Sequence, residues 1–147
     1  MAKTGSVLFV DDDPDWVDLL RTVFERAGIP NPVQGVRDGP EVLRYLRGEG
    51  RYANRVAHPL PKLVLLDLRL PGMHGFEVLQ WIRRQPRLAE LAVVVITGMV
   101  APGDAQRAQE LGATGFLAKP FSLAKLVEMA EQIRESWLQT DRLVETR

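Results

Sequence analysis

Short apolar runs alternate along the chain with longer segments in which apolar residues recur every three or four positions. The runs predict five strands, over residues 6–10, 32–36, 62–67, 92–97 and 115–118. The longer segments predict five helices, over residues 14–27, 39–47, 75–85, 102–111 and 123–142. Strict alternation is typical of a parallel sheet covered on both faces. The pattern therefore predicts an α/β fold, a doubly wound (βα)5 unit.

Capping and strand-breaking residues add detail to this prediction. Asp13 and Asp38 stand where helix N-caps are expected. Pro32 and Gly35 favour an edge position for the second strand. Residues 48–61 are expected to form a long loop.

The last helix is expected to place one apolar face on the core. Five residues at helical spacing define that face: Leu123, Leu126, Ala130, Ile133 and Trp137. Phe121, just before this helix, is also expected in the core rather than at an interface.

Four polar residues each follow an apolar run where a predicted strand ends: Asp12, Asp67, Thr97 and Lys119. In doubly wound sheets, sites lie beyond the carboxyl ends of the strands, so we expect these side chains at one edge. A buried carboxylate is costly unless something binds it. Carboxylates, a hydroxyl and an ammonium are the groups that hold Mg²⁺ and a phosphoryl group.

Asp11 and Asp12 arrive together at the end of the first strand, and Asp13 follows. Mg²⁺ prefers oxygen ligands, which Asp11, Asp12 and Asp67 would supply. The alternative is that Asp11 and Asp12 are solvated turn residues. For Asp13, a helix cap is the favoured interpretation.

Asp67 is the expected nucleophile, because carboxylates are known to form covalent intermediates such as acyl phosphates. Lys119 would offset charge on the transferring group, and Thr97 would donate its hydroxyl to it. A cis bond before Pro120 would aim Lys119 into the site. Taken alone, Asp67 could merely cap a turn and Thr97 could be an ordinary strand residue.

The bulk composition favours one self-sufficient domain. A chain of 147 residues predicts a single unit over residues 1–147, with a core over about residues 5–138 and no output domain. It has no cysteine, which fits a reducing cytoplasm, and no signal-like or membrane-spanning apolar stretch. Its 19 basic and 19 acidic residues balance, so neither a nucleic acid nor a membrane is an expected partner.

The chain resembles the receiver domain of two-component response regulators, the CheY-like family, over nearly its whole length. The resemblance rests on four motifs: VDDDP at 10–14, LLDLRLPGMHG at 65–75, VITG at 95–98 and FLAKPF at 116–121. It implies a flavodoxin-like fold with strand order 2-1-3-4-5. Residues 48–61 further resemble the insertion of stand-alone receivers found with phytochrome-type histidine kinases.

The resemblance also implies a phosphorylation cycle. A histidine kinase or phosphotransfer protein would donate a phosphoryl group to Asp67. Mg²⁺ would be held by Asp12, Asp67 and the backbone carbonyl of Arg69, and Asp11 would assist the metal site. Such a protein is a signalling phosphoacceptor that assists its own Mg²⁺-dependent phosphotransfer and dephosphorylation, not an enzyme.

After phosphorylation, the resemblance implies that Thr97 turns toward the phosphoryl group and that Phe116 packs inward as the switch aromatic. The output surface would be the face of the fourth helix, fifth strand and last helix. The domain would then relay phosphate, bind a partner or form a homodimer.

Several positions depart from the common receiver pattern. Phe116 lacks the hydroxyl of the tyrosine found in many receivers, and Gly98 replaces a common alanine or serine. Arg69 and Met99 are expected to flank the phosphoryl pocket, where such residues tune dephosphorylation. His74 stands where aspartate is frequent and is expected to be a loop residue.

Three other functions compete with this interpretation. A haloacid-dehalogenase-like phosphatase would use Asp11 as nucleophile and Asp13 as acid, but no acidic pair follows Lys119 to hold the metal. A pseudo-receiver would bind partners without phosphorylation, which the intact acidic set disfavours. A flavin-binding protein is disfavoured because acidic residues occupy the first turn, where a phosphate needs backbone amides.

Overall fold

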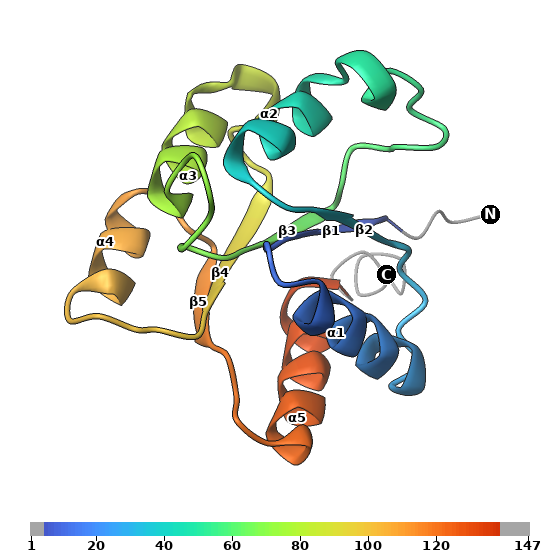
Figure 1. Ribbon diagram of the computed structural model, residues 1–147, viewed down its shortest axis with the longest axis vertical. Coiled ribbons are helices and arrows are strands. Elements are labelled where there is room, and N and C mark those ends of the chain that lie inside the picture. The colour runs from blue at the N-terminus through green and yellow to red at the C-terminus, as the bar shows by residue number, and fades with distance from the viewer. Residues whose placement is uncertain (1–4, 139–147) are drawn as a thin grey trace, which may run out of the picture.

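The computed structural model describes residues 5–138 and contains a five-stranded parallel sheet in the order β2-β1-β3-β4-β5 (Figure 1). The strands are β1 Val7–Val10, β2 Val33–Val36, β3 Leu63–Leu66, β4 Ala92–Thr97 and β5 Gly115–Ala118. The helices are α1 Pro14–Arg26, α2 Gly39–Arg47, α3 Gly75–Arg84, α4 Asp104–Glu110 and α5 Leu123–Ile133. The predicted fold class and strand order are confirmed, including the edge position of β2.

Alternating residues of the central strands point to opposite faces of the sheet, and each face has its own layer of helices. α1 and α5 cover one face, where Phe9 of β1 packs edge-on against Phe24 of α1 at 5.5 Å between ring centroids. α2 and α3 cover the other face, where Leu8 and Val64 are buried. Figure 1 shows α1 and α5 on one side of the sheet and α2 and α3 on the other. Every residue of β1 and β3 is buried because both faces are covered.

The predicted caps form at the first two helices. Asp13 accepts hydrogen bonds from the backbone amides of Asp15 and Trp16, and Asp38 accepts one from that of Glu41. His74 lies in the loop before α3, as predicted, but it also has a structural role that was not predicted. His74 is the N-cap of α3 and forms a capping box with Glu77, since its ring nitrogen can accept from a backbone amide as a hydroxyl does.

The expected loop over residues 48–61 folds back onto α2. It contains a short 3-10 helix, η1 (Gly50–Tyr52), and Tyr52 is buried with its ring 4.9 Å from that of Tyr45. Arg55 donates to the carbonyl groups of Tyr45 and Leu46 in the last turn of α2, where the regular helical hydrogen bonds run out. The segment is therefore anchored by aromatic packing and by an arginine cap, which its polar composition did not indicate.

The C-terminal apolar face differs from the prediction at its start. Phe121 is fully exposed and Leu123 is 63% exposed, because the beginning of α5 projects beyond the sheet (Figure 1). The buried residues of α5 are Leu126, Met129, Ala130 and Ile133. Trp137 lies in a π-helix, η3 (Arg134–Leu138), and packs partly buried against the α1–α5 core. The predicted continuation to residue 142 lies outside the described residues.

Within residues 5–138, no helix is long and apolar enough to cross a membrane.

Candidate functional site

Hydrogen bonds between the strand ends bring the predicted site residues to one edge of the sheet. The amide of Asp67 donates to the carbonyl of Val10 at 3.0 Å, which sets Asp67 beside Asp11. The amide of Lys119 donates to the carbonyl of Thr97 at 2.9 Å. β1, β3, β4 and β5 thus deliver their carboxyl ends side by side, as the parallel order requires.

Three carboxylates form the acidic part of the site. Asp11, Asp12 and Asp67 each offer an oxygen, and these atoms all lie within 4.8 Å of one another. Asp11 and Asp67 are 4% and 7% exposed, whereas Asp12 is open to solvent. A cluster of hard oxygen donors with one solvent-facing member fits a divalent cation that keeps some of its water. Asp13 points elsewhere, as the cap of α1.

Lys119 supplies the positive charge of the site. Its Nζ lies 2.6 Å from Asp11 Oδ2 and 3.3 Å from Asp67 Oδ2. Burial lowers the pKa of Lys119, but the hydrogen bond to Asp11 and the charges of both carboxylates together raise it above the ordinary value. The bond to Pro120 is trans, so Lys119 reaches the site without the cis bond that the sequence left open.

Asp11 is held in an electrostatically costly position. Burial raises its pKa above the ordinary 3.8, and the nearby charge of Asp67 adds to the rise. Lys119 and the backbone amide of Asp13, which donates to Asp11 at 2.9 Å, act in the opposite direction. The folded chain therefore keeps a carboxylate where solvation is poor, which primes Asp11 to gain from a bound cation.

Thr97 and Phe116 lie on the β4–β5 side of the site. Thr97 is fully buried, and its hydroxyl accepts a long hydrogen bond of 3.4 Å from the amide of Met99. Phe116 is half-buried and packs against a small cluster formed by Leu68, Val95 and Ala108. In the sheet, Phe116 pairs with Val95 of β4, two positions before Thr97, and it packs against the cluster that includes Ala108 of α4.

Arg69 links two loops at the rim of the site. Its guanidinium donates to the carbonyl of Met99 at 3.2 Å and lies 3.5 Å from the carboxylate of Asp104 in α4. It also lies 3.4 Å from the His74 ring. Arg69 and Met99 were predicted at this rim, but Asp104 was not, because its contact spans 35 residues of sequence.

Trp16 was also missed. Its ring lies in the first turn of α1, with Lys119 Nζ 4.9 Å from the ring centroid. The available signal was an aromatic residue four positions after Asp12, one helical turn beyond the acidic strand end.

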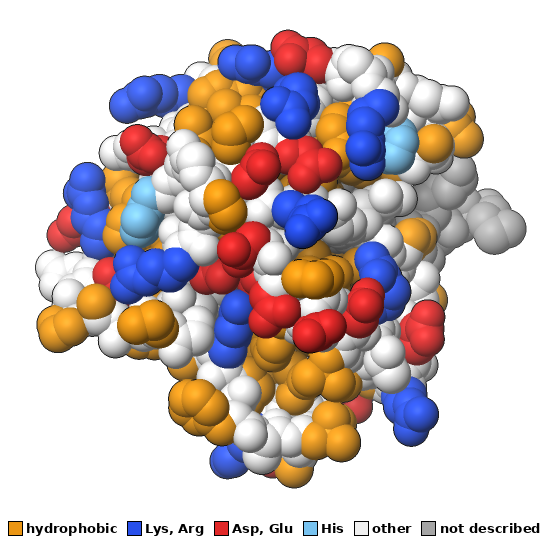
Figure 2. All heavy atoms as spheres, viewed as in Figure 1, with side chains coloured by type: hydrophobic (Ala, Val, Ile, Leu, Met, Phe, Trp, Pro, Cys, Tyr) orange, Lys and Arg blue, Asp and Glu red, His pale blue; other side chains and the backbone are white. Residues whose placement is uncertain are grey.

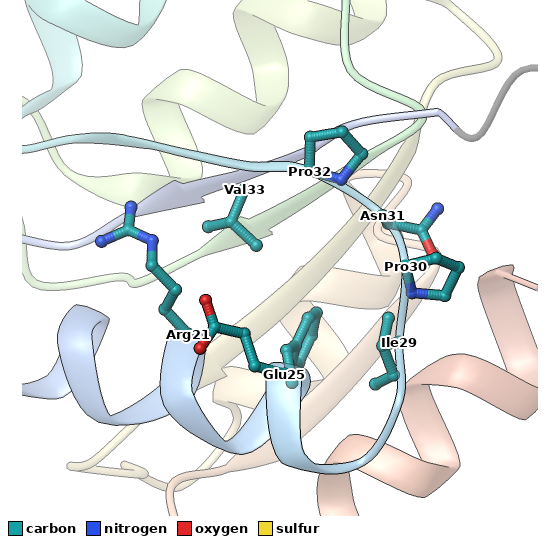
Figure 3. Close-up of a pocket in the computed structure, with 8 residues that line it drawn as sticks. Arg21, Glu25, Ile29, Pro30, Asn31, Pro32 and Val33 are labelled. Carbon is teal, nitrogen blue, oxygen red and sulfur yellow. The ribbon is translucent and has the colours of Figure 1, made fainter.

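The site occupies one face of the molecule, and a separate hollow lies elsewhere on the surface. Figure 2 shows acidic side chains gathered across the middle of the face where β1 and β3 end. A hollow of about 340 Å³ lies at the opposite edge, between the end of α1 and the start of β2. Figure 3 shows Arg21 and Glu25 on one side of it and Pro30, Asn31 and Pro32 on the other.

Residues 7–131 match the family model described as the response regulator receiver domain. The chain belongs to this family. Receivers of this type take phosphoryl groups from histidine kinases and bind a divalent metal at an acidic pocket, and the cluster described above stands in that place. The receiver interpretation is confirmed, and the phosphatase and flavin alternatives are set aside.

Individual relatives place the chain close to small receivers. It is 39% identical over 139 residues to the probable methanogenesis regulatory protein FilR2 of Methanothrix harundinacea, covering 92% of this chain and 85% of that one. It is 34% identical over 134 residues to response regulator Rcp1 of Synechocystis, covering 91% and 89%. The phosphorylated cyanobacterial phytochrome response regulator RcpA superposes with a TM-score of 0.85 at 33% identity, covering 94% and 96%. The predicted likeness to phytochrome-associated receivers is confirmed.

Proposed function

We propose that Asp67 is the phosphoacceptor of this receiver. The observation that carries the proposal is the convergence of Asp67 with Asp11, Asp12 and Lys119 at one edge of the sheet. Asp67 Oδ2 accepts from Lys119, and Oδ1 accepts from the amide of Arg69 at 3.3 Å. A carboxylate oxygen of Asp67 would attack phosphorus, and the bond to the imidazole nitrogen of a phosphohistidine would break with its electron pair leaving on that nitrogen.

We propose Mg²⁺ as the metal, held by Asp11, Asp12, Asp67 and the backbone carbonyl of Arg69. Three carboxylates and one ammonium leave two negative charges in excess, which suits a divalent cation. When bound, the ion would neutralise charge that develops on the transferring group. The Mn²⁺-bound form of Rcp1, at a TM-score of 0.83, supports a divalent site in a similar receiver.

The remaining site residues would stabilise and report the phosphoryl group. Lys119 would exchange a carboxylate oxygen for a phosphoryl oxygen, and the Thr97 hydroxyl would replace its weak bond to Met99 with one to the phosphoryl group. Phosphorylation adds about −1.5 to −2 charges at one point. Movement of Thr97 would open space into which the half-buried ring of Phe116 can shift, which gives the switch two alternative packings.

The switch would act on a partner-binding face formed by α4, β5 and α5. β5 is only half-buried, unlike the fully buried β1 and β3, so its outer side is open to a partner. Exposed apolar side chains flank the site end of this face: Met99, Val100, Phe121, Leu123 and Val127. The partners we propose are a histidine kinase or phosphotransfer protein as donor and, at the output face, a target protein or a second copy of the chain.

The test is phosphorylation by acetyl phosphate in the presence of Mg²⁺, followed by intact mass. We expect one added phosphoryl group, which is lost in Asp67→Asn and in a sample with EDTA. A folded chain that binds Mg²⁺ but gains no phosphoryl from acetyl phosphate or from a purified histidine kinase would overturn the proposal and favour the pseudo-receiver.

A further inference from the structure

The ammonium group of Lys119 has a third neighbour besides its two carboxylates. Trp16 lies with its ring centroid 4.9 Å from Nζ, within the range of a cation–π contact. Two contacts hold Trp16 in place. Its backbone amide donates to the capping carboxylate of Asp13, and the ring packs partly buried against the α1–α5 core.

A cation–π contact differs from a hydrogen bond in one respect that matters here. An ammonium carries three N–H donors, which need acceptors in defined directions. The face of an aromatic ring attracts the positive charge itself, so the attraction does not depend on which way the N–H groups point. Contact with Trp16 can therefore persist while Lys119 changes its hydrogen-bond partners.

Such a change is required if the proposed function is right. In the described structure, the shortest bond of Lys119 goes to Asp11, at 2.6 Å, and that to Asp67 is longer, at 3.3 Å. Asp11 is also one of the three carboxylates placed to hold the cation. A cation on Asp11 would repel the ammonium and draw charge from the same carboxylate, which weakens the bond from Lys119 to Asp11 as the site fills.

We propose that Trp16 is a positioning residue for Lys119. It keeps the ammonium beside Asp67 while its acceptor changes from Asp11 to the phosphoryl group. The inference rests on the proposed function of Asp67, and it concerns a contact from α1 that lies outside the four receiver motifs.

The first experiment measures the rate of phosphorylation by acetyl phosphate for the intact chain and for Trp16→Phe and Trp16→Leu. A contact of ordinary strength predicts a rate about 2- to 30-fold lower in Trp16→Leu, with Trp16→Phe between the two. Trp81→Leu is the matched control. Trp81 also carries a cation–π contact, with Arg47 at 5.2 Å, but it lies in α3 away from the site. Its rate should equal that of the unmodified chain.

The second experiment separates positioning from packing of α1 by a double-mutant cycle with Lys119→Met. If Trp16 acts through the ammonium, Trp16→Leu lowers the rate of the unmodified chain but not that of Lys119→Met. An equal loss in both backgrounds would assign Trp16 to packing and overturn the inference.

A spectroscopic measurement gives a result that does not depend on phosphorylation. In a chain with Trp81→Phe and Trp137→Phe, Trp16 is the remaining tryptophan of the three. Its emission should change when Mg²⁺ is added and should not change in the same chain with Lys119→Met. Identical Mg²⁺ responses with and without the lysine would contradict the inference. The unmodified chain could also show this lysine-dependent response and yet take up no phosphoryl group. That result would contradict the proposed role of Asp67 but support the contact between Trp16 and Lys119.

Discussion

Replacement of Lys119 by methionine should destabilise the metal-free protein more than loss of any exposed lysine. Its side chain is 18% exposed and contacts carboxylates that are 5% and 8% exposed, those of Asp11 and Asp67. Methionine keeps most of the length of the apolar stem but removes the charge. Two poorly solvated carboxylates then face each other without a counter-ion. The loss of stability therefore comes mainly from the uncompensated charge of Asp11 and Asp67.

The size of the effect follows from this geometry. Breaking a buried ion pair costs about 3–5 kcal/mol, and we expect about 3 kcal/mol because all three groups retain some solvent. For a domain of this size the loss corresponds to a drop in Tm of about 6–12 °C. Mg²⁺ at about 100 times its Kd would return about 2.7 kcal/mol, because it supplies the missing positive charge and binds only the folded state.

The pH dependence has a defined sign. The pKa of Lys119 is raised, so its stabilising contribution is complete below the ordinary value of 10.5 and is lost as the pH rises through the folded value. The pKa of Asp11 is raised by burial and by the charge of Asp67, so the folded state holds that proton more tightly and stability falls as the pH rises from 3.8 through the folded value. In Lys119→Met, acidification should therefore recover part of the lost stability.

The assay is chemical denaturation of both proteins in EDTA and in Mg²⁺, with Lys125→Met as the control. Lys125 pairs with Glu128 at 3.9 Å, and both side chains are 71% exposed. Its loss should cost at most about 0.5 kcal/mol. Two results would contradict a buried ion pair at Lys119. One is a loss of stability in Lys119→Met no larger than that in Lys125→Met, and the other is weaker stabilisation of Lys119→Met than of the unmodified chain by Mg²⁺.

Two further predictions concern the neighbouring elements. Tyr52→Phe removes the hydrogen bond to Glu41 and should lower the free energy of unfolding by about 1 kcal/mol. Amide hydrogen exchange over residues 48–61 should become faster. Unchanged exchange would contradict the anchoring of this segment by Tyr52. Burial and the Glu41 contact raise the pKa of Tyr52 to about 12. The contribution of Tyr52 to stability is therefore complete below the ordinary pKa of 10.0 and is lost as the pH rises through about 12. Phenolate absorbance can follow this titration. Gly75→Ala would set a Cβ 2.6 Å from the carbonyl oxygen of Asp67 and should cost about 1–3 kcal/mol by denaturation. Gly35→Ala, whose Cβ meets nothing closer than 3.6 Å, should be tolerated, and equal losses in the two variants would refute the steric argument.

The sequence was informative where local pattern and global fold agree. Apolar runs that end in a single polar residue located the strands, and parallel order then required their ends to meet. That logic correctly predicted that Asp67 and Lys119 lie close together. It could not predict the short bond from Lys119 to Asp11, because the balance between two nearby carboxylates depends on side-chain geometry.

The errors have physical causes as well. Leu123 has helical spacing with the buried residues of α5, which is why it was predicted in the core. It is exposed because the first turn of α5 lies beyond the edge of the sheet. His74 was overlooked as a cap because histidine is not a favoured N-cap residue, although Glu77 three positions later was a usable signal. Tyr52 is buried through contacts with α2 that composition could not indicate.

We propose that Asp67, and no other carboxylate of the acidic cluster, carries the phosphoryl group. The most direct measurement is borohydride reduction after phosphorylation by acetyl phosphate, because reduction converts a phosphorylated aspartate to homoserine. Peptide mass analysis then locates the converted residue. We expect homoserine at position 67 alone, and we expect no conversion when Mg²⁺ is removed. Homoserine at position 11 or 12 in the folded, Mg²⁺-loaded protein would contradict it.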